Sequence, residues 1–72
     1  MPQTLVKDVE FFVAALSRTF VSALQRDPDG MYSRVGFGVI EKFSEDVVRL
    51  KKFDGTVSHY ARDITKFQRN LG

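Results

Sequence analysis

The side chains that could support catalysis are few and poorly arranged. Ser58 and His59 are adjacent, but neighbouring residues of a strand face opposite sides of a sheet, so they cannot act together as a nucleophilic pair. Glu41 with Glu45 or Asp46 would form a carboxylate pair for acid–base chemistry, although a solvated strand end explains these residues better. Since the chain has no cysteine nucleophile, we expect no enzymatic activity.

Metal and cofactor sites are not expected either. The absence of cysteine excludes disulfides and every Cys-based zinc or iron–sulfur site, and His59 is the single histidine. Gly36-Phe37-Gly38 is too short for a phosphate-binding glycine loop and lacks a following helix. We therefore expect no metal, no cofactor and no small-molecule substrate.

Charge is distributed unevenly along the chain. Residues 1–30 carry three basic and four acidic side chains, whereas residues 31–72 carry eight basic and five acidic ones. A basic half suits a nucleic acid or another polyanion as a partner. An ordinary solvated surface is the alternative explanation.

The length of 72 residues predicts a single domain, residues 1–72, with a small core. Domains of this size usually need a disulfide, a metal or a partner subunit, and only oligomerisation remains here. No apolar run approaches the roughly 20 residues of a membrane span, and residues 1–4 show no basic signal region. We expect a cytoplasmic protein without a membrane partner.

The N-terminal part has helical periodicity, and we predict a helix over about residues 5–19. Thr4 is the expected N-cap, and Asp8 and Glu10 suit the positive end of the helix dipole. Asp27-Pro28-Asp29-Gly30 is typical of a type I turn followed by a glycine bulge. The apolar residues of the helix stripe are Leu5, Val9, Phe12, Leu16 and Phe20, widened by Val6 and Val13.

The period changes after the turn, and residues 20–68 predict a strongly bent, five-stranded antiparallel sheet. Gly36 and Gly38 inside a strand indicate a sharp bend or a close backbone approach. Asp54-Gly55 suits a two-residue type I′ turn. The expected strands are residues 31–43, 46–53, 56–60 and 64–68, with residues 20–26 as either a first strand or the end of the helix. The alternative is three helices over residues 5–25, 31–53 and 57–71.

Two segments resemble motifs of the Sm/LSm family, in the Hfq-like form found in bacterial RNA chaperones. Residues 38–51 (GVIEKFSEDVVRLK) are similar to the first Sm motif, and residues 56–64 (TVSHYARDI) are similar to the second. The polar loops differ from those of the family, so the resemblance is that of a divergent member. The resemblance implies a mainly β fold, an N-terminal helix followed by an Sm-like or SH3-like small barrel.

The resemblance also implies a homo-oligomeric ring, in which sheet edges pair between neighbouring subunits. Residues 56–60 of one subunit would lie beside residues 64–68 of the next. Such pairing would remove the free edges of the sheet. The candidate interface residues are Val57, Tyr60, Ile64 and Phe67, for which a core position is the alternative.

Finally, the resemblance implies binding of single-stranded RNA and a role in RNA metabolism or regulation. An aromatic ring stacks on a base, and a guanidinium group binds phosphate or stacks on a base. The alternative role for Arg62 is an ion pair with Asp63 or Glu45. The negative charges of Glu45 and Asp46 are unfavourable for binding a polyanion. The alternatives for the whole chain are a structural or protein-interaction ring without RNA binding, and a three-helix regulatory domain. The candidate RNA-binding residues are Lys42, Phe43, Ser44, His59, Tyr60 and Arg62.

Overall fold

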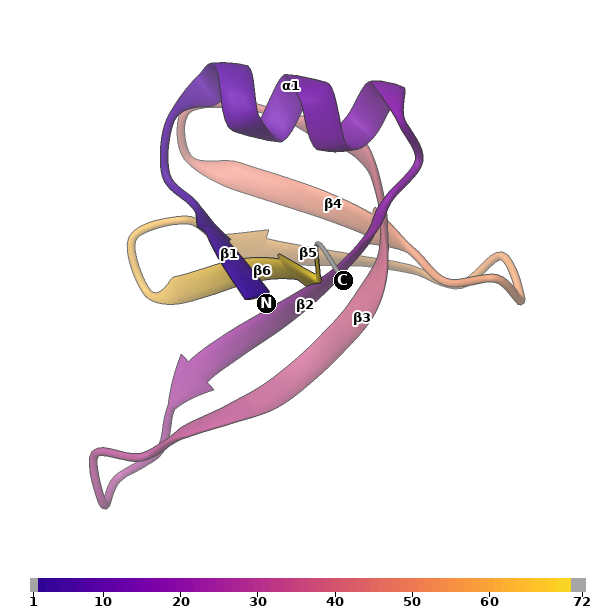
Figure 1. The fold of residues 1–72 in the computed structure, drawn as a ribbon. Coiled ribbons are helices and arrows are strands. Elements are labelled where there is room, and N and C mark those ends of the chain that lie inside the picture. The colour runs from indigo at the N-terminus through magenta and orange to yellow at the C-terminus, as the bar shows by residue number, and fades with distance from the viewer. Residues whose placement is uncertain (1, 71–72) are drawn as a thin grey trace.

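The computed structural model describes residues 2–70 of the chain, which contain one helix and six strands (Figure 1). The strands form one antiparallel sheet in the order β1–β6–β2–β3–β4–β5. The elements are β1 Pro2–Leu5, α1 Asp8–Leu16, β2 Phe20–Arg26, β3 Tyr32–Phe43, β4 Val47–Lys51, β5 Val57–Ala61 and β6 Thr65–Asn70. The mainly β prediction is confirmed, and the three-helix alternative is wrong.

The sheet differs from the prediction in two ways: it has six strands rather than five, and it is not closed into a barrel. The additional strand is β1, which pairs with β6 from Pro2 opposite Asn70 to Leu5 opposite Phe67. This pairing buries Leu5 to 4% exposure. Thr4 therefore belongs to a strand and does not cap the helix.

The helix is shorter than predicted because residues 2–5 are extended. Lys7 occupies the N-cap position with φ −86° and ψ 150°. The Glu10 carboxylate accepts hydrogen bonds from the backbone N–H groups of Val6 and Lys7, both at 2.8 Å. These two donors would otherwise have no partner at the start of the helix.

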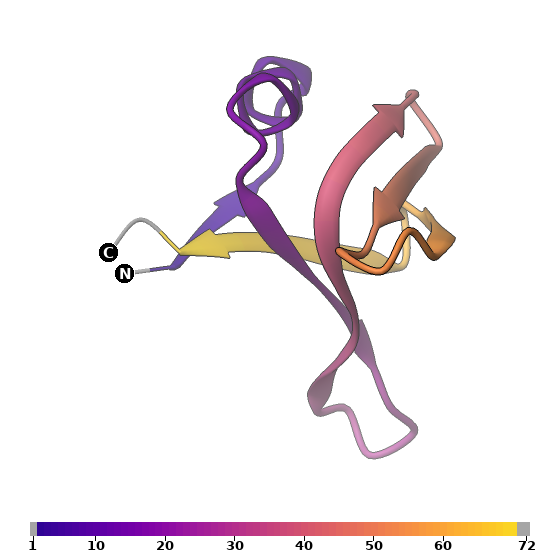
Figure 2. The ribbon, with the colours of Figure 1, turned by 90° about the vertical axis from the view of Figure 1, so that its right-hand side faces the viewer.

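The predicted apolar stripe is not the buried face of α1, which lies over one side of the bent sheet (Figure 2). Phe11 and Ala14 are buried, whereas Phe12 is 53% exposed and Leu16 is 70% exposed. The segment has apolar residues on both faces, so periodicity alone could not select the face. The pairing of β1 with β6 fixes where the helix begins and therefore which face of α1 packs on the sheet.

Strand β3 bends sharply around the core (Figure 2). Its two central glycines permit close contacts with residues of β4 and β5. A Cβ atom at Gly36 would overlap the phenol of Tyr60, and one at Gly38 would lie 2.5 Å from the Lys51 carbonyl oxygen. The prediction of a close approach at these glycines is confirmed. The core between helix and sheet contains Leu5, Phe11, Ala14, Val21, Ala23, Ile40, Val48, Leu50 and Phe67.

The β2–β3 and β4–β5 hairpins have the same turn geometry. Gly30 (φ 84°) closes the predicted turn after Asp27, with its N–H donating to the Asp27 carbonyl at 2.9 Å. Gly55 (φ 91°) likewise donates to the Lys52 carbonyl at 2.9 Å. A type I′ turn needs positive φ at both central residues, and Asp54 does not have it, so that turn prediction is wrong.

Residues 56–60 of one subunit cannot pair with residues 64–68 of the next, as was predicted, because both sides of β6 are occupied. Strand β6 already pairs with β2 along residues 65–69 and with β1 along residues 67–70. The open edges of the described sheet are the outer sides of β1 and β5. Phe67 is 1% exposed and Tyr60 packs on its ring, so the core alternative applies to both residues.

Candidate nucleic-acid interface

Four of the six candidate RNA-binding residues meet at one surface hollow. This hollow has a volume of about 310 Å³ and lies on the outer side of the sheet, where β3, β4 and β5 run together. The other two candidates, Tyr60 and Arg62, do not line it. The lining residues are Lys42, Phe43, Ser44, Val47, Arg49 and His59.

A basic row crosses the three strands of this hollow. Lys42 is directly opposite Arg49 in the β3–β4 ladder, and Arg49 is directly opposite His59 in the β4–β5 ladder. Residues opposite one another in an antiparallel pair point to the same side of the sheet. Lys42 and His59 are exposed and Arg49 is half-buried. The row therefore presents two permanent positive charges and an imidazole to solvent.

Glu41 partly neutralises the row. A register shift between Ile40 and Lys42 leaves Glu41 unpaired in the ladder. Its carboxylate oxygens lie 2.8 Å from Arg49 Nε and 3.8 Å from Lys51 Nζ. Ion pairs this exposed contribute about 1 kcal/mol or less. Lys42 forms no ion pair with any residue of the described chain and is the most available cation of the row.

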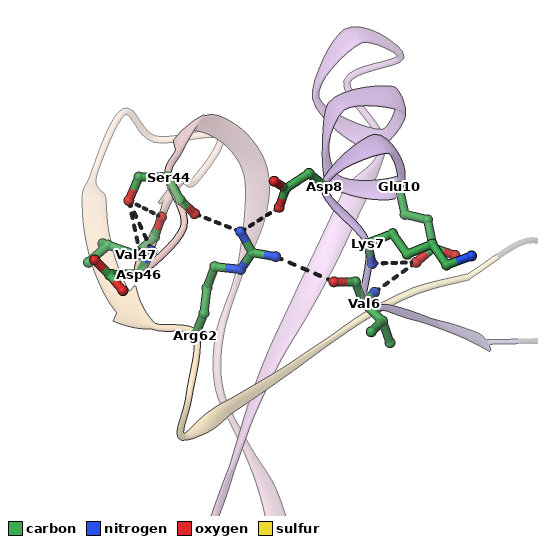
Figure 3. Close-up of polar contacts among 8 residues, drawn as sticks. All are labelled: Val6, Lys7, Asp8, Glu10, Ser44, Asp46, Val47 and Arg62. Carbon is green, nitrogen blue, oxygen red and sulfur yellow. Dashed lines mark hydrogen bonds and ion pairs between the residues drawn. The ribbon is translucent and has the colours of Figure 1, made fainter.

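Ser44 has a structural role in the loop that borders the hollow. Its hydroxyl accepts hydrogen bonds from the backbone N–H groups of Asp46 at 3.3 Å and Val47 at 3.2 Å (Figure 3). The Ser44 N–H also donates to the Val47 carbonyl at 2.8 Å. The side chain thereby holds the tight turn between β3 and β4, which positions Phe43 and Lys42.

Arg62 is held within the protein. Its Nη1 donates to Asp8 Oδ1 at 2.9 Å and to the Ser44 carbonyl at 2.7 Å, and its Nη2 donates to the Val6 carbonyl at 3.4 Å (Figure 3). The guanidinium also lies 4.3 Å from the centre of the Phe11 ring, and the side chain is 15% exposed. Its acidic partner is Asp8, not Asp63 or Glu45. Arg62 thus joins the start of α1 to the loop after β3.

Tyr60 points to the inner side of the sheet. It is opposite the buried Val48, its ring meets that of Phe67 edge-on at 6.4 Å, and its hydroxyl donates to the Val35 carbonyl at 3.5 Å. The adjacent His59 points to the outer side. Tyr60 and His59 therefore do not act on the same ligand, and no base can stack on Tyr60 in this arrangement.

A second group of residues, missed in the sequence, lies on the outer side of β2, β3 and β6. We call it the cation–aromatic strip. The alternation of Tyr32 and Arg34 could have pointed to part of it. Phe37 lies on the same side only because a register shift opposite Ala23 and Leu24 leaves Val35 unpaired. Neither this shift nor the pairing of β6 with β2 could be read from the sequence. Its residues are Phe20, Arg26, Tyr32, Arg34, Phe37 and Lys66.

Two carboxylates outside these surfaces have altered acidity. Backbone hydrogen bonds from Lys7 and Val6 lower the pKa of Glu10 below its ordinary value of 4.5. Backbone and side-chain hydrogen bonds from Thr56 lower the pKa of Asp54 below its ordinary value of 3.8. Both carboxylates stabilise local turns, and neither is placed for chemistry.

No cluster of three or more metal-binding side chains occurs within residues 2–70. Over the same residues, no helix has both the length and the apolar character needed to cross a membrane. Comparisons with models of protein families, with curated proteins and with solved structures give no match to this chain.

Proposed function

We propose that this protein is an Sm-like RNA-binding protein that holds single-stranded RNA at the hollow between β3, β4 and β5. The observation that carries the proposal is the row of Lys42, Arg49 and His59 across one hollow, which Phe43 and Ser44 also line. The Phe43 ring itself packs against the core, 5.8 Å from the Phe11 ring. The four candidate residues come from two separate segments of the sequence, residues 42–44 and residue 59, and they line the same hollow.

The chemistry of the row suits the backbone of a single strand. Lys42 and Arg49 attract phosphate groups, and His59 donates a hydrogen bond to a phosphate or a base. Glu41 holds Arg49 in place and limits the positive charge, which favours modest affinity. Glu45 and Asp46 remain the main unfavourable charges near the hollow, and both lie in the loop rather than in the row.

We also propose that the chain assembles with copies of itself into a closed ring. The two open sheet edges, β1 and β5, lie at opposite ends of the strand order, so β5 of one subunit can extend the sheet of the next at β1. Edge pairing of this kind removes free edges and enlarges the buried area of a small domain. Val57 and Ile64 remain the exposed candidates for contact between subunits, at 39% and 62% exposure.

A protein-interaction ring without RNA binding is the second candidate, and the outer side of α1 favours it. Val9 is 60% exposed, Phe12 is 53% exposed and Leu16 is 70% exposed. An apolar helix face of this size is unusual for a surface that contacts only water.

Titration of fluorescently labelled oligo(U) and oligo(A) at two salt concentrations separates the two functions. RNA binding predicts that affinity falls with salt, because bound phosphates release counterions. Lys42→Ala should flatten the plot of log affinity against log salt by about 0.7 for a single strand. Lys52→Ala, which removes an exposed lysine outside the hollow, is the matched control. No binding at low salt would refute the proposal.

A further inference from the structure

The cation–aromatic strip brings together three exposed rings and three cations on the outer side of β2, β3 and β6. The rings of Phe20 and Phe37 stack at 5.1 Å with an interplanar angle of 12°. Arg34 lies 5.1 Å from the centre of the Phe37 ring. Around Tyr32, the distances to the ring centre are 5.3 Å for the Arg26 guanidinium and 5.1 Å for Lys66 Nζ.

The sheet register explains why these residues share one side. Arg26 is directly opposite Tyr32 in the β2–β3 ladder. Leu24, two residues before Arg26 and therefore on the same side, is opposite Arg34 in β3 and Lys66 in β6. The strip therefore spans three neighbouring strands rather than a single loop.

The three aromatic rings of the strip are unusually exposed, which indicates that a partner covers them. Phe20, Tyr32 and Phe37 are 43%, 46% and 41% exposed, although aromatic side chains normally supply much of the buried area of a small core. Each strand of the strip contributes at least one cation. None of the outward-facing residues along β2, β6 and the stretch of β3 that pairs with β2 is acidic.

We propose that the strip is a second binding site for single-stranded nucleic acid, in which bases stack on Tyr32 and Phe37 while Arg26, Arg34 and Lys66 contact phosphates. Exposed rings interleaved with cations are the combination that binds single strands without sequence preference. The outward-facing strand residues around the rings include no acidic group, which suits a polyanion, and the nearby carboxylates of Asp27, Asp29 and Asp63 lie in loops. This inference rests on the proposed function and adds a stacking site to it.

The adjacent groove offers room for a nucleotide. It has a volume of about 790 Å³ and is bordered by Tyr32, Arg26 and Lys66 on the strip side. Gln25 and Thr65 line it as well, with Gln25 Nε2 donating to Thr65 Oγ1 at 2.9 Å. Gln25 and Thr65 alternate with Arg26 and Lys66 along their strands, so the groove extends from the strip towards the inner side of the sheet.

The strip and the hollow make different contributions to binding. The hollow has charged groups but no exposed aromatic ring, whereas the strip has three. Loss of a ring should lower affinity at every salt concentration with little change in the salt dependence, because stacking releases few counterions. Loss of a cation at either site should flatten the salt dependence.

The test is a titration of labelled oligo(U) and oligo(A) with Tyr32→Leu and Phe37→Leu, using Phe53→Leu as the matched control. Phe53 is 93% exposed at the tip of the β4–β5 hairpin, far from the strip in the sheet order. Each strip variant should weaken binding about tenfold, and the control should leave it unchanged. Circular dichroism checks that each variant is folded, and Arg34→Ala replaces any variant that is not.

The outcomes separate the strip from the hollow. Weaker binding by the strip variants with unchanged binding by Lys42→Ala supports the strip and refutes the hollow. Weaker binding by Lys42→Ala with unchanged binding by Tyr32→Leu and Phe37→Leu overturns the strip and leaves the hollow standing. Strip variants that lose self-association in light scattering but keep their affinity for oligonucleotides also overturn it, because the strip would then contact a second copy.

Discussion

The guanidinium group of Arg62 lies 4.3 Å from the centre of the Phe11 ring, between the start of the helix and the loop after β3. Phe11 is buried at the centre of an aromatic group, with Phe67 at 5.6 Å and Phe43 at 5.8 Å. Arg62, which the sequence predicted to bind RNA, therefore covers one side of the core instead. Its position fixes the loop that carries Ser44, and through that loop the shape of the hollow.

Arg62→Ala should destabilise the protein by about 2–3 kcal/mol, because it removes a desolvated cation–π contact and hydrogen bonds from a charged donor. Arg62→Lys should cost less, since it keeps the charge and loses the planar fork. Asp8→Asn is the control: the Asp8 side chain is 74% exposed, so its ion pair contributes less than about 1 kcal/mol. Urea unfolding measures all three. Equal stability of Arg62→Ala and wild type would contradict the structural role.

Gly36→Ala should cost about 2 kcal/mol, because the added methyl group overlaps the phenol of Tyr60. Tyr60→Phe should recover part of that loss, since it removes the nearest atom. Gly38→Ala should cost as much or more without any such recovery, because its methyl group would meet the Lys51 backbone. A double-mutant cycle of unfolding free energies tests this, and no coupling between positions 36 and 60 would be inconsistent with the packing.

The Glu10 carboxylate makes stability depend on acid pH. Its pKa is lowered in the folded protein, so its contribution is fully present above the ordinary value of 4.5 and is lost as the pH falls through the lowered pKa. Glu10→Gln should therefore be less stable than wild type at pH 7, with the difference shrinking below about pH 4.5. Urea midpoints from pH 7 to pH 3 measure this. A difference that stays constant over the range would contradict the hydrogen bonds to Val6 and Lys7.

The assembly proposal predicts a mass above 8.2 kDa for the wild-type chain in light scattering after size-exclusion chromatography. Val57→Lys and Ile64→Lys should lower this mass, because each places a charge where subunits would meet. Phe53→Lys is the control, since Phe53 is more exposed than either and lies at a hairpin tip. A monomeric wild-type chain would remove the assembly proposal and leave the binding sites to be tested alone.

Local signals in the sequence predicted some of the local structure, although the Thr4 cap and the type I′ turn at Asp54-Gly55 were wrong. Pro28 and Gly30 predicted their turn, and the glycines of β3 predicted a close approach, because these residues act through their own backbone. Contacts between distant segments could not be predicted in the same way. Strand β1 forms by pairing with residues 67–70, and Arg62 finds Asp8 only after folding.

The candidate site shows the same division. Lys42, Phe43 and Ser44 are consecutive at the end of β3, so their proximity follows from the sequence. His59 lies beside them because β5 pairs with β4. The prediction that Tyr60 binds RNA together with His59 was wrong. Neighbouring residues of β5 face opposite sides of the sheet, and the local sequence does not indicate which side faces the core. The cation–aromatic strip was missed because it depends on the pairing of β6 with β2.

Amide chemical-shift mapping is the most direct test of the central claim that the outer side of this sheet binds single-stranded RNA. Unlabelled oligo(U) or oligo(A) is added to the isotope-labelled protein at low salt. The account predicts shifts at Lys42, Arg49 and His59, and at the strip around Tyr32, with no change on the outer side of α1. An unchanged spectrum, or shifts confined to α1, would contradict it.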